Sequence, residues 1–180
     1  MNNSKAKKKR ILTAVQVKAI FERFAREMAK QYGSLDQVVF IGIRTRGPYV
    51  AKRLAEIVKQ RHKKEIPIGE MDITLYRDDL NALLPGGTID HTRIPFDIAN
   101  KIVVLFDDVL HTGRTVRAAV DHLIDLGRPR MIHLAVMIDR GGRELPIAAN
   151  YVGKKINLKA GGNVEVRLKD VDKTDEVFVE

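Results

Sequence analysis

Apolar and polar positions along the chain change their spacing several times, and the spacing predicts strands and helices in turn. Val38–Ile43, Lys101–Asp107 and Met131–Ile138 are short apolar runs typical of buried strands. Apolar residues recur at helical spacing in Ala14–Lys30 and Val116–Ile124. Strands that alternate with helices form a mostly parallel sheet covered by helices on both faces. The pattern therefore predicts an α/β fold.

The remaining segments fit the same alternation. Pro48 suits the first turn of a helix that continues over Tyr49–His62. Ile66–Tyr76 is expected to be extended, and Val164–Leu168 to be a last short strand. Between them, Arg77–Ile94 is polar and contains Pro85-Gly86-Gly87, which predicts a long loop or a mobile hairpin. Loops of this length in a compact domain are usually functional or disordered.

Composition bounds the class of protein. The chain has 180 residues, 44% of them hydrophobic, which is enough for one domain with a sizeable core. The formal net charge is +9, and the first ten residues hold five of the basic side chains and no acid. We expect residues 1–11 to be a flexible basic arm and residues 12–180 to be a single domain. The positive balance suits a ligand rich in phosphate.

Several classes of protein and site are disfavoured. There is no cysteine, so disulfides and thiolate sites are excluded, and the five histidines lack metal-ligand spacing. No apolar stretch approaches the roughly 20 residues that a membrane span needs, and the basic start is not followed by an apolar signal core. We therefore expect a soluble cytoplasmic protein without a membrane partner.

The most informative segment is the end of the predicted strand Lys101–Asp107. Four apolar residues lead into Asp107 and Asp108, and a short turn with Thr112 and Gly113 then leads into a helix. Ligands of open α/β sheets bind at the carboxyl ends of the strands. The two acids and the turn should therefore lie together at a binding crevice.

The chemistry of this segment can be narrowed by exclusion. The chain has neither the Gly-Lys-Ser/Thr of a P-loop nor the glycine fingerprint of a dinucleotide site. A phosphoryl-accepting aspartate usually has a second acid two residues on, where this chain has Val109. The helix N-terminus can bind a phosphate, while two acids can accept hydrogen bonds from vicinal hydroxyls or bind a metal. This combination describes a ribose 5-phosphate site; the alternative is a helix cap with a surface acid.

Residues 103–115 resemble the signature of type I phosphoribosyltransferases, which bind 5-phosphoribosyl-1-pyrophosphate (PRPP). Four further segments are similar to the PyrR family of pyrimidine operon regulators, which are also uracil phosphoribosyltransferases; these are residues 43–47, 72–80, 113–118 and 139–147. The resemblance implies the type I phosphoribosyltransferase fold, a mostly parallel twisted sheet flanked by helices. It also implies a small hood built from about residues 139–180 and the N-terminal segment.

The resemblance implies conversion of uracil and PRPP to UMP and pyrophosphate. Mg²⁺ would be the cofactor, held mainly by PRPP, so that no residue is assigned as a firm metal ligand. Arg77, Asp107 and Asp108 would be the catalytic residues. The residues that would bind PRPP or nucleotide are Arg44, Thr45, Arg46, Gly47, Asp107, Asp108, Val109, Leu110, His111, Thr112, Gly113, Arg114 and Thr115.

The implied roles differ along the chain. Residues 44–47 would form the pyrophosphate loop, often with a non-proline cis peptide, although surface charge alone would also explain the arginines. Arg77 would lie on a mobile catalytic loop that closes over the ligand, or else form a salt bridge with Asp78 or Asp79. Asp139, Arg140 and Val164 would lie at the base and the hood; an ion pair is the alternative for Arg140. His111 would contact the ligand or face solvent.

The same family binds leader RNA through a basic surface of a dimer, and uridine nucleotides promote that binding. The resemblance therefore implies a homodimer or higher homo-oligomer with RNA as a further partner. The basic residues kept at that surface are Arg23, Arg26, Lys30, Arg143 and Lys154. The chain departs from the family pattern at Glu22, Gly142 and Ala148. We therefore hypothesise that RNA binding is weakened or retuned, since an added acid and lost cations oppose binding to phosphate; a merely solvated basic helix is the alternative.

Two other functions stay open at this stage. The chain could be an RNA-binding regulator with little catalysis, which would bind PRPP without turnover. It could also be a phosphoribosyltransferase for another base, such as a purine, without RNA regulation.

Overall fold

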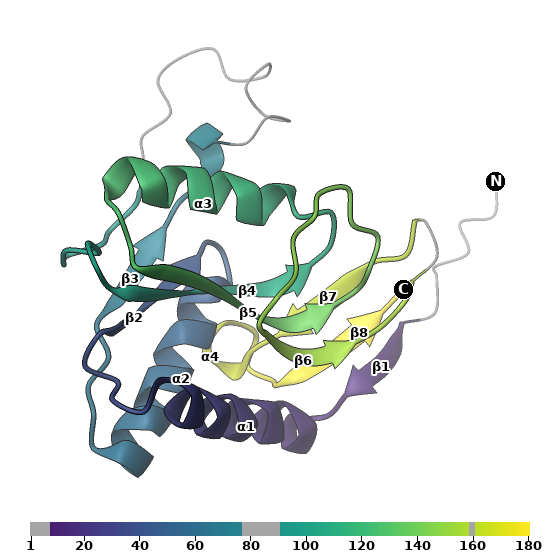
Figure 1. The fold of residues 1–180 in the computed structure, drawn as a ribbon. Helices are drawn as coiled ribbons and strands as arrows, with labels where there is room; N and C mark the ends of the chain where they lie inside the picture. The colour runs from purple at the N-terminus through teal and green to yellow at the C-terminus, as the bar shows by residue number, and fades with distance from the viewer. Residues whose placement is uncertain (1–7, 77–90, 159–160) are drawn as a thin grey trace.

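The computed structural model describes residues 8–76, 91–158 and 161–180 of the chain. A five-stranded parallel sheet with the order β3-β2-β4-β5-β6 lies at the centre of the fold (Figure 1). Its strands are β2 (Val38–Ile43), β3 (Ile68–Met71), β4 (Ile102–Leu110), β5 (Met131–Asp139) and β6 (Tyr151–Lys155). The predicted α/β class is confirmed.

Helices cover both faces of this sheet. Figure 1 shows α1 (Ala14–Tyr32) and α2 (Gly47–His62) on one face and α3 (Arg114–Leu126) on the other. The face below α1 and α2 buries aromatic side chains, with the rings of Phe40 and Phe106 4.8 Å apart. The face below α3 buries mainly aliphatic side chains of β2, β4, β5 and the helix itself. Both faces of the strands are buried, which explains why they are continuous apolar runs in the sequence.

The order of the strands locates the binding edge. From β2 the chain crosses through α2 to β3 on one side, and from β4 it crosses through α3 to β5 on the other side. The connections therefore diverge between β2 and β4, and a crevice forms at the carboxyl ends of the strands where this happens. Residues 44–47 follow β2 and residues 111–113 follow β4, so both predicted ligand loops begin at this point.

A second, antiparallel sheet of three strands forms the hood and has the order β1-β8-β7. Its elements are β1 (Lys9–Leu12), β7 (Val164–Arg167), the short helix α4 (Lys169–Asp172) and β8 (Glu176–Val179). Val166, Leu168 and Val177 are buried and belong to the same core as α1 and α2. The hood is therefore packed onto the main sheet and shares its core.

The N-terminal prediction is wrong for residues 9–11. The sequence predicts a flexible arm there, but these residues belong to β1, which pairs with β8. The basic side chains there have acidic partners, because Lys8 forms ion pairs with Glu165 and Glu180, and Arg10 pairs with Glu176. The basic segment at the N-terminus therefore includes an edge strand of the hood sheet.

Other boundaries also differ from the predictions. β4 continues three residues beyond the predicted end at Asp107, because Val109 and Leu110 still pair with β5. In Ile66–Tyr76 only β3 is a strand, and a 3₁₀ turn, η1 (Thr74–Tyr76), follows it. Most of the predicted long loop, residues 77–90, lies outside the described residues. Among the helices that the structure describes, none is long and apolar enough to cross a membrane.

Candidate functional site

The two acids of β4 lie in different surroundings, although they are adjacent in sequence. Asp107 is only 7% exposed, whereas Asp108 is half-buried. The Asp108 N–H donates to Asp107 Oδ1 at 2.8 Å, and the Val109 N–H donates to Asp108 Oδ1 at 2.9 Å. Burial and the neighbouring Asp108 carboxyl raise the pKa of Asp107 well above its ordinary value. The pair therefore places two carboxyl groups near the carboxyl end of β4, where a cation or a ligand with hydroxyl groups would bind favourably to them.

The turn after β4 lets a ligand approach the N-terminus of α3. Gly113 is the N-cap, has a φ of 97°, and provides no side-chain cap for the helix. The left-handed conformation at this position favours glycine. The first backbone N–H groups of a helix have no helical partners and lie at the positive end of its dipole. The helix start is thus suited to bind a phosphate group.

Part of the segment 139–147, which the family resemblance singles out without giving it a contact to this turn, supports the turn. The N–H groups of Glu144 and Leu145 donate to the Thr112 carbonyl at 3.0 and 3.1 Å. The Arg114 Nε donates to Glu144 Oε2 at 2.7 Å. A side chain at Gly113 would come within 3.3 Å of Ile147. Residues 144–147 therefore fix the shape of the turn, and no local pattern indicates this because the contacts are about 30 residues apart in sequence.

The loop between β2 and α2 lies directly beside the carboxylate pair. The peptide between Arg44 and Thr45 is cis, as the family resemblance implied. A side chain at Gly47 would meet the carbonyl oxygen of Phe106 at 2.2 Å, so only glycine allows the helix start to lie so close to β4. Phe106 immediately precedes Asp107. The structure therefore places Gly47 against the residue of β4 that precedes the two acids.

Two arginines at this edge have unused donors. Among the described residues, the Nε atoms of Arg46 and Arg140 are buried and have no hydrogen-bond partner. A buried unpaired donor on a charged group is costly, so each atom favours an anionic ligand or a bound water. Arg140 is anchored by its own N–H, which donates to the Leu110 carbonyl at 3.1 Å.

The predicted base side of the site lies at the end of β5. Asp139 pairs in register with Leu110 of β4 and Lys155 of β6. It lines a cavity of about 340 Å³ together with Gly141, Arg143, Lys155, Ile156 and Asn157. Val164, the third residue assigned to this part, begins β7 in the hood.

His111 lies between the phosphate turn and the base side. Its ring faces Gly142, because a side chain at that position would come within 3.0 Å of the His111 Nε2 atom. Partial burial and the positive charge of Arg140 lower the pKa of His111. Because Gly142 has no side chain, it leaves room for this imidazole.

The residues assigned to RNA divide into two groups. Arg26 and Lys30 are exposed on α1. Arg143 instead has internal partners: it pairs with Asp139 at 2.6 Å and donates to the His111 carbonyl at 2.7 Å. Arg23 donates to the carbonyls of Val152 and Gly153, and Lys154 to the carbonyl of Ile11. Arg77, assigned to catalysis, lies outside the described residues.

The acids at the site could bind Mg²⁺ only if a phosphate-bearing ligand supplied some of the other oxygen ligands. Within residues 8–76, 91–158 and 161–180, no group of three or more acidic, histidine or cysteine side chains could hold a metal ion. Mg²⁺ in phosphate sites commonly keeps several waters and binds one or two carboxylates and the phosphates themselves. Asp107 and Asp108 match that smaller requirement, with the other ligands coming from the substrate.

Comparison with solved structures supports the fold. The chain matches a hypoxanthine phosphoribosyltransferase of Trypanosoma cruzi with a TM-score of 0.73 at 16% identity, covering 95% of both chains. It matches a hypoxanthine phosphoribosyltransferase of Staphylococcus aureus with a TM-score of 0.68 at 20% identity, covering 94% of this chain and 90% of the other. These similarities show the type I phosphoribosyltransferase fold and no more.

Comparison of sequences is more specific. Residues 8–170 match the phosphoribosyl transferase domain family. The chain is 48% identical to the bifunctional protein PyrR of Chloroflexus aurantiacus over 95% of this chain and 94% of the relative. It is 47% identical to that of Bacillus cereus, covering 94% and 95%, and 45% identical to that of Thermus thermophilus, covering 94% of each chain. The chain therefore belongs to the phosphoribosyltransferases and, among them, to the PyrR family.

Proposed function

We propose that this member of the PyrR family transfers the phosphoribosyl group of PRPP to uracil, forming UMP and pyrophosphate. The observation that carries the proposal is the pair of the buried Asp107 and the half-buried Asp108, near the start of α3 and at the point where the strand connections diverge. Acceptors for ribose hydroxyls and donors for a 5-phosphate are needed a few ångströms apart, and this edge of the sheet supplies both.

Each part of PRPP has a proposed partner. Asp107 and Asp108 accept hydrogen bonds from the ribose hydroxyls. The backbone and hydroxyl groups of residues 111–115 bind the 5-phosphate, with Val109 and Leu110 shaping the approach. Residues 44–47 bind the pyrophosphate, because the start of α2 also lacks a side-chain cap and Arg46 has an unpartnered buried Nε. Mg²⁺, when bound, neutralises part of the charge of the phosphates.

The proposed reaction needs electrostatic stabilisation more than a nucleophilic side chain. The bond between ribose C1 and the pyrophosphate oxygen breaks and uracil N1 forms a bond to C1. The N1 proton passes to the departing pyrophosphate or to water. Positive charge develops on the ribose while negative charge gathers on pyrophosphate. Arg44 and Arg46 stabilise the leaving group, and we assign Arg77 to the same task.

We propose that uracil binds at the end of β5, beside Asp139 and Arg140. The cavity of about 340 Å³ at Asp139 and the unpartnered Nε of Arg140 support this position. Val164 would contact the base from the hood. The structural neighbours act on hypoxanthine, but their identity to this chain is too low to transfer a substrate.

The test is formation of UMP from uracil and PRPP in the presence of Mg²⁺, with hypoxanthine and guanine assayed beside uracil. Of the three bases, we expect only uracil to react with PRPP. Binding of PRPP without formation of UMP would contradict the proposal in favour of a regulator that has lost catalysis. Turnover with a purine base would contradict it in favour of a different phosphoribosyltransferase.

As a second function we propose that the chain binds pyrimidine operon leader RNA when a uridine nucleotide is bound. A hollow of about 650 Å³ lined by Arg23, Lys30 and Lys155, among others, lies between α1 and the strand β6. Glu22, the acid that would repel RNA, pairs with Arg61 of α2 at 2.5 Å, so its charge is partly neutralised. The internal contacts of Arg143 leave it less available to phosphate, which supports the hypothesis of weakened binding.

A gel shift with the leader RNA of the same genome, with and without UMP, tests this second function. We expect a shift that UMP strengthens and that the R26Q/K30Q variant reduces, since each lost cation lowers salt-dependent affinity. Absence of a shift in both conditions would contradict RNA binding. We further propose that the chain acts in the cytoplasm as a homodimer or a higher homo-oligomer. Light scattering, which measures the mass of the assembly, tests the oligomeric state.

A further inference from the structure

The loop proposed to bind pyrophosphate is tied to the hood by one ion pair. The Arg46 Nη2 lies 3.0 Å from Asp172 Oδ1, and these residues are 126 positions apart in sequence. The other oxygen of Asp172, Oδ2, accepts from the Leu168 N–H at 3.0 Å. A single carboxylate therefore joins the end of β7 to the residue that begins α2.

The environment makes this pair more than a surface contact. The side chains of Arg46 and Asp172 are 31% and 22% exposed, so both are shielded on most sides. Exposed pairs contribute little because water screens them, and shielding strengthens the attraction. Only Nη2 of Arg46 contacts the carboxylate, while its buried Nε has no partner among the described residues. The guanidinium is thus held on one edge and keeps donors for another anion.

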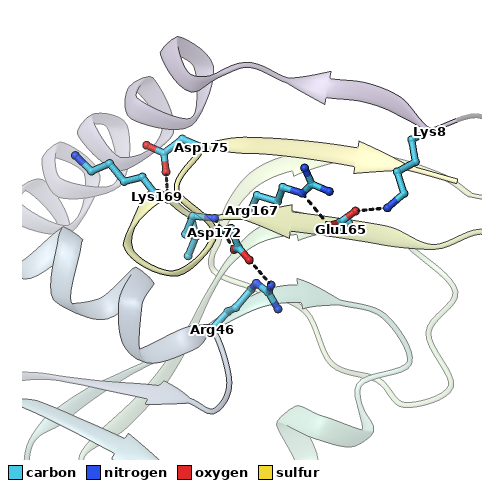
Figure 2. Close-up of polar contacts among 8 residues, drawn as sticks. Lys8, Arg46, Glu165, Arg167, Lys169, Asp172 and Asp175 are labelled. Atoms are coloured by element: carbon cyan, nitrogen blue, oxygen red, sulfur yellow. Dashed lines mark hydrogen bonds and ion pairs between the residues drawn. The ribbon is translucent and has the colours of Figure 1, made fainter.

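The same turn of the hood is anchored independently of Asp172. Arg53, two turns along α2, pairs with Asp170 and with Asp175, the latter at 2.8 Å. The Arg53 guanidinium also lies over the ring of Phe21, 5.0 Å from its centroid. Asp175 in turn accepts from the Lys169 N–H at 2.9 Å (Figure 2). These contacts dock α4 onto α2, so the Asp172 carboxylate can act on Arg46 without having to hold the hood in place.

We infer that Asp172 is a positioning residue for the reaction: it orients the Arg46 guanidinium so that the free donors face the pyrophosphate group of PRPP. The inference rests on the proposed function, since it takes residues 44–47 as the pyrophosphate loop. A flexible arginine loses side-chain freedom when it binds an anion, and a carboxylate that fixes it in advance reduces this cost. The alternative is that Asp172 competes with pyrophosphate for Arg46, which predicts the opposite change in affinity.

The variant D172N separates these possibilities. Its amide oxygen can still accept from the Leu168 N–H, but its neutral side chain no longer attracts the guanidinium. We expect the KM for PRPP to rise about tenfold, the range of a lost hydrogen bond to a charged group, with the KM for uracil unchanged. Inhibition by pyrophosphate should weaken by a similar factor. D172E, which keeps the charge, should recover most of the PRPP affinity.

The matched control is D170N, which changes the same residue type in the same turn and affects only the pair with Arg53. We expect D170N to lower the melting temperature without changing the KM for PRPP. An unchanged KM in D172N, equal changes in both variants, or a lower KM for PRPP in D172N would each overturn the inference. If the wild type forms no UMP, the proposed function fails; the inference is then tested by the Kd of PRPP with Mg²⁺ in the same variants.

Discussion

The three long helices begin in two different ways. The first turn of α1 is closed by its own side chains: the Thr13 N–H donates to Gln16 Oε1 at 2.9 Å, and the Gln16 N–H donates to the Thr13 hydroxyl at 3.4 Å. By contrast, α2 and α3 begin at Arg46 and Gly113, and neither residue forms a side-chain cap. The N-cap side chain of α1 thus accepts from the helix, whereas the N-cap residues of α2 and α3 do not; at α3 the Arg114 N–H has a side-chain acceptor nearby, the Thr112 hydroxyl at 3.3 Å.

The difference follows the topology. The uncapped helices α2 and α3 follow β2 and β4, where the strand connections diverge, whereas the capped helix α1 follows a strand of the hood. Capping a helix start contributes about 1 kcal/mol of stability, so leaving one uncapped has a cost. The side-chain cap is absent at the two helix starts where a phosphate could accept from the backbone N–H groups instead. If the two kinds of helix start have separate roles, substitutions at α3 should affect ligand binding and substitutions at α1 should affect stability alone.

The largest effect is expected from removing both acids beside the start of α3. The D107N/D108N variant should lose about a thousandfold or more of UMP formation, because each carboxyl group that accepts from the ribose hydroxyls is replaced by an amide with a single acceptor oxygen. The control is D121N/D125N, which replaces two other aspartates by asparagine on α3. Asp121 pairs with Arg117, and Asp125 accepts from the Tyr76 hydroxyl. Steady-state rates measure both variants, and a comparable loss in the control would contradict the assigned role.

A smaller effect is expected at the glycine that starts α3. The G113A variant should raise the KM for PRPP by about 10- to 100-fold, because a φ of 97° and contact with Ile147 oppose a side chain and shift the turn. Gly161 provides the matched control, with a φ of 85° and no atom within 4 Å of an added Cβ. G161A should incur similar backbone strain and leave the KM unchanged. Equal KM values for G113A and the wild type would remove the turn from the site.

The single variant D107N should stabilise the protein while it loses activity. The raised pKa of Asp107 means that the fold prefers the neutral carboxyl, so its contribution to stability is present at acidic pH and is lost as the pH rises through that raised pKa. D107N should therefore melt at a higher temperature than the wild type, with a difference that grows as the pH rises above the ordinary carboxyl pKa of about 4. Calorimetric scans across this range check it. A difference that shrinks as the pH rises would contradict the burial argument.

The smallest effect is expected at the capped helix. T13A should cost about 1 kcal/mol, or roughly 2–4 °C in the melting temperature of a domain of this size, because the Gln16 N–H loses its acceptor. The KM values for PRPP and uracil should not change. A change in either would mean that the start of α1 also serves the site and that the two kinds of helix start are not distinct.

The parts of the fold that could be predicted are those with a local cause. The strands around Val38 and Val103 are continuous apolar runs because both faces of the sheet are covered. The turn at Gly113 is visible because a glycine follows an acid pair and precedes an amphipathic helix. β1 was missed because its basic residues resemble a disordered arm, and they belong to a strand only through pairing with β8, more than 160 residues away.

The parts of the site that could not be predicted depend on long-range contacts. Asp172 follows a short strand and looks like a surface acid in the sequence, and only the packing of the hood brings it to Arg46. Similarly, the charge of Arg143 and the resemblance of the chain to the family predict that this residue binds RNA. Its partners, Asp139 and the His111 carbonyl, are evident only once β5 and the turn after β4 lie side by side.

The most direct test of the account is a crystal structure of the chain with PRPP and Mg²⁺. It should show the ribose hydroxyls on Asp107 and Asp108, the 5-phosphate at the start of α3, and the pyrophosphate beside Arg46 at the start of α2. A ribose bound away from the acids, or phosphates placed away from both uncapped helix starts, would contradict the account.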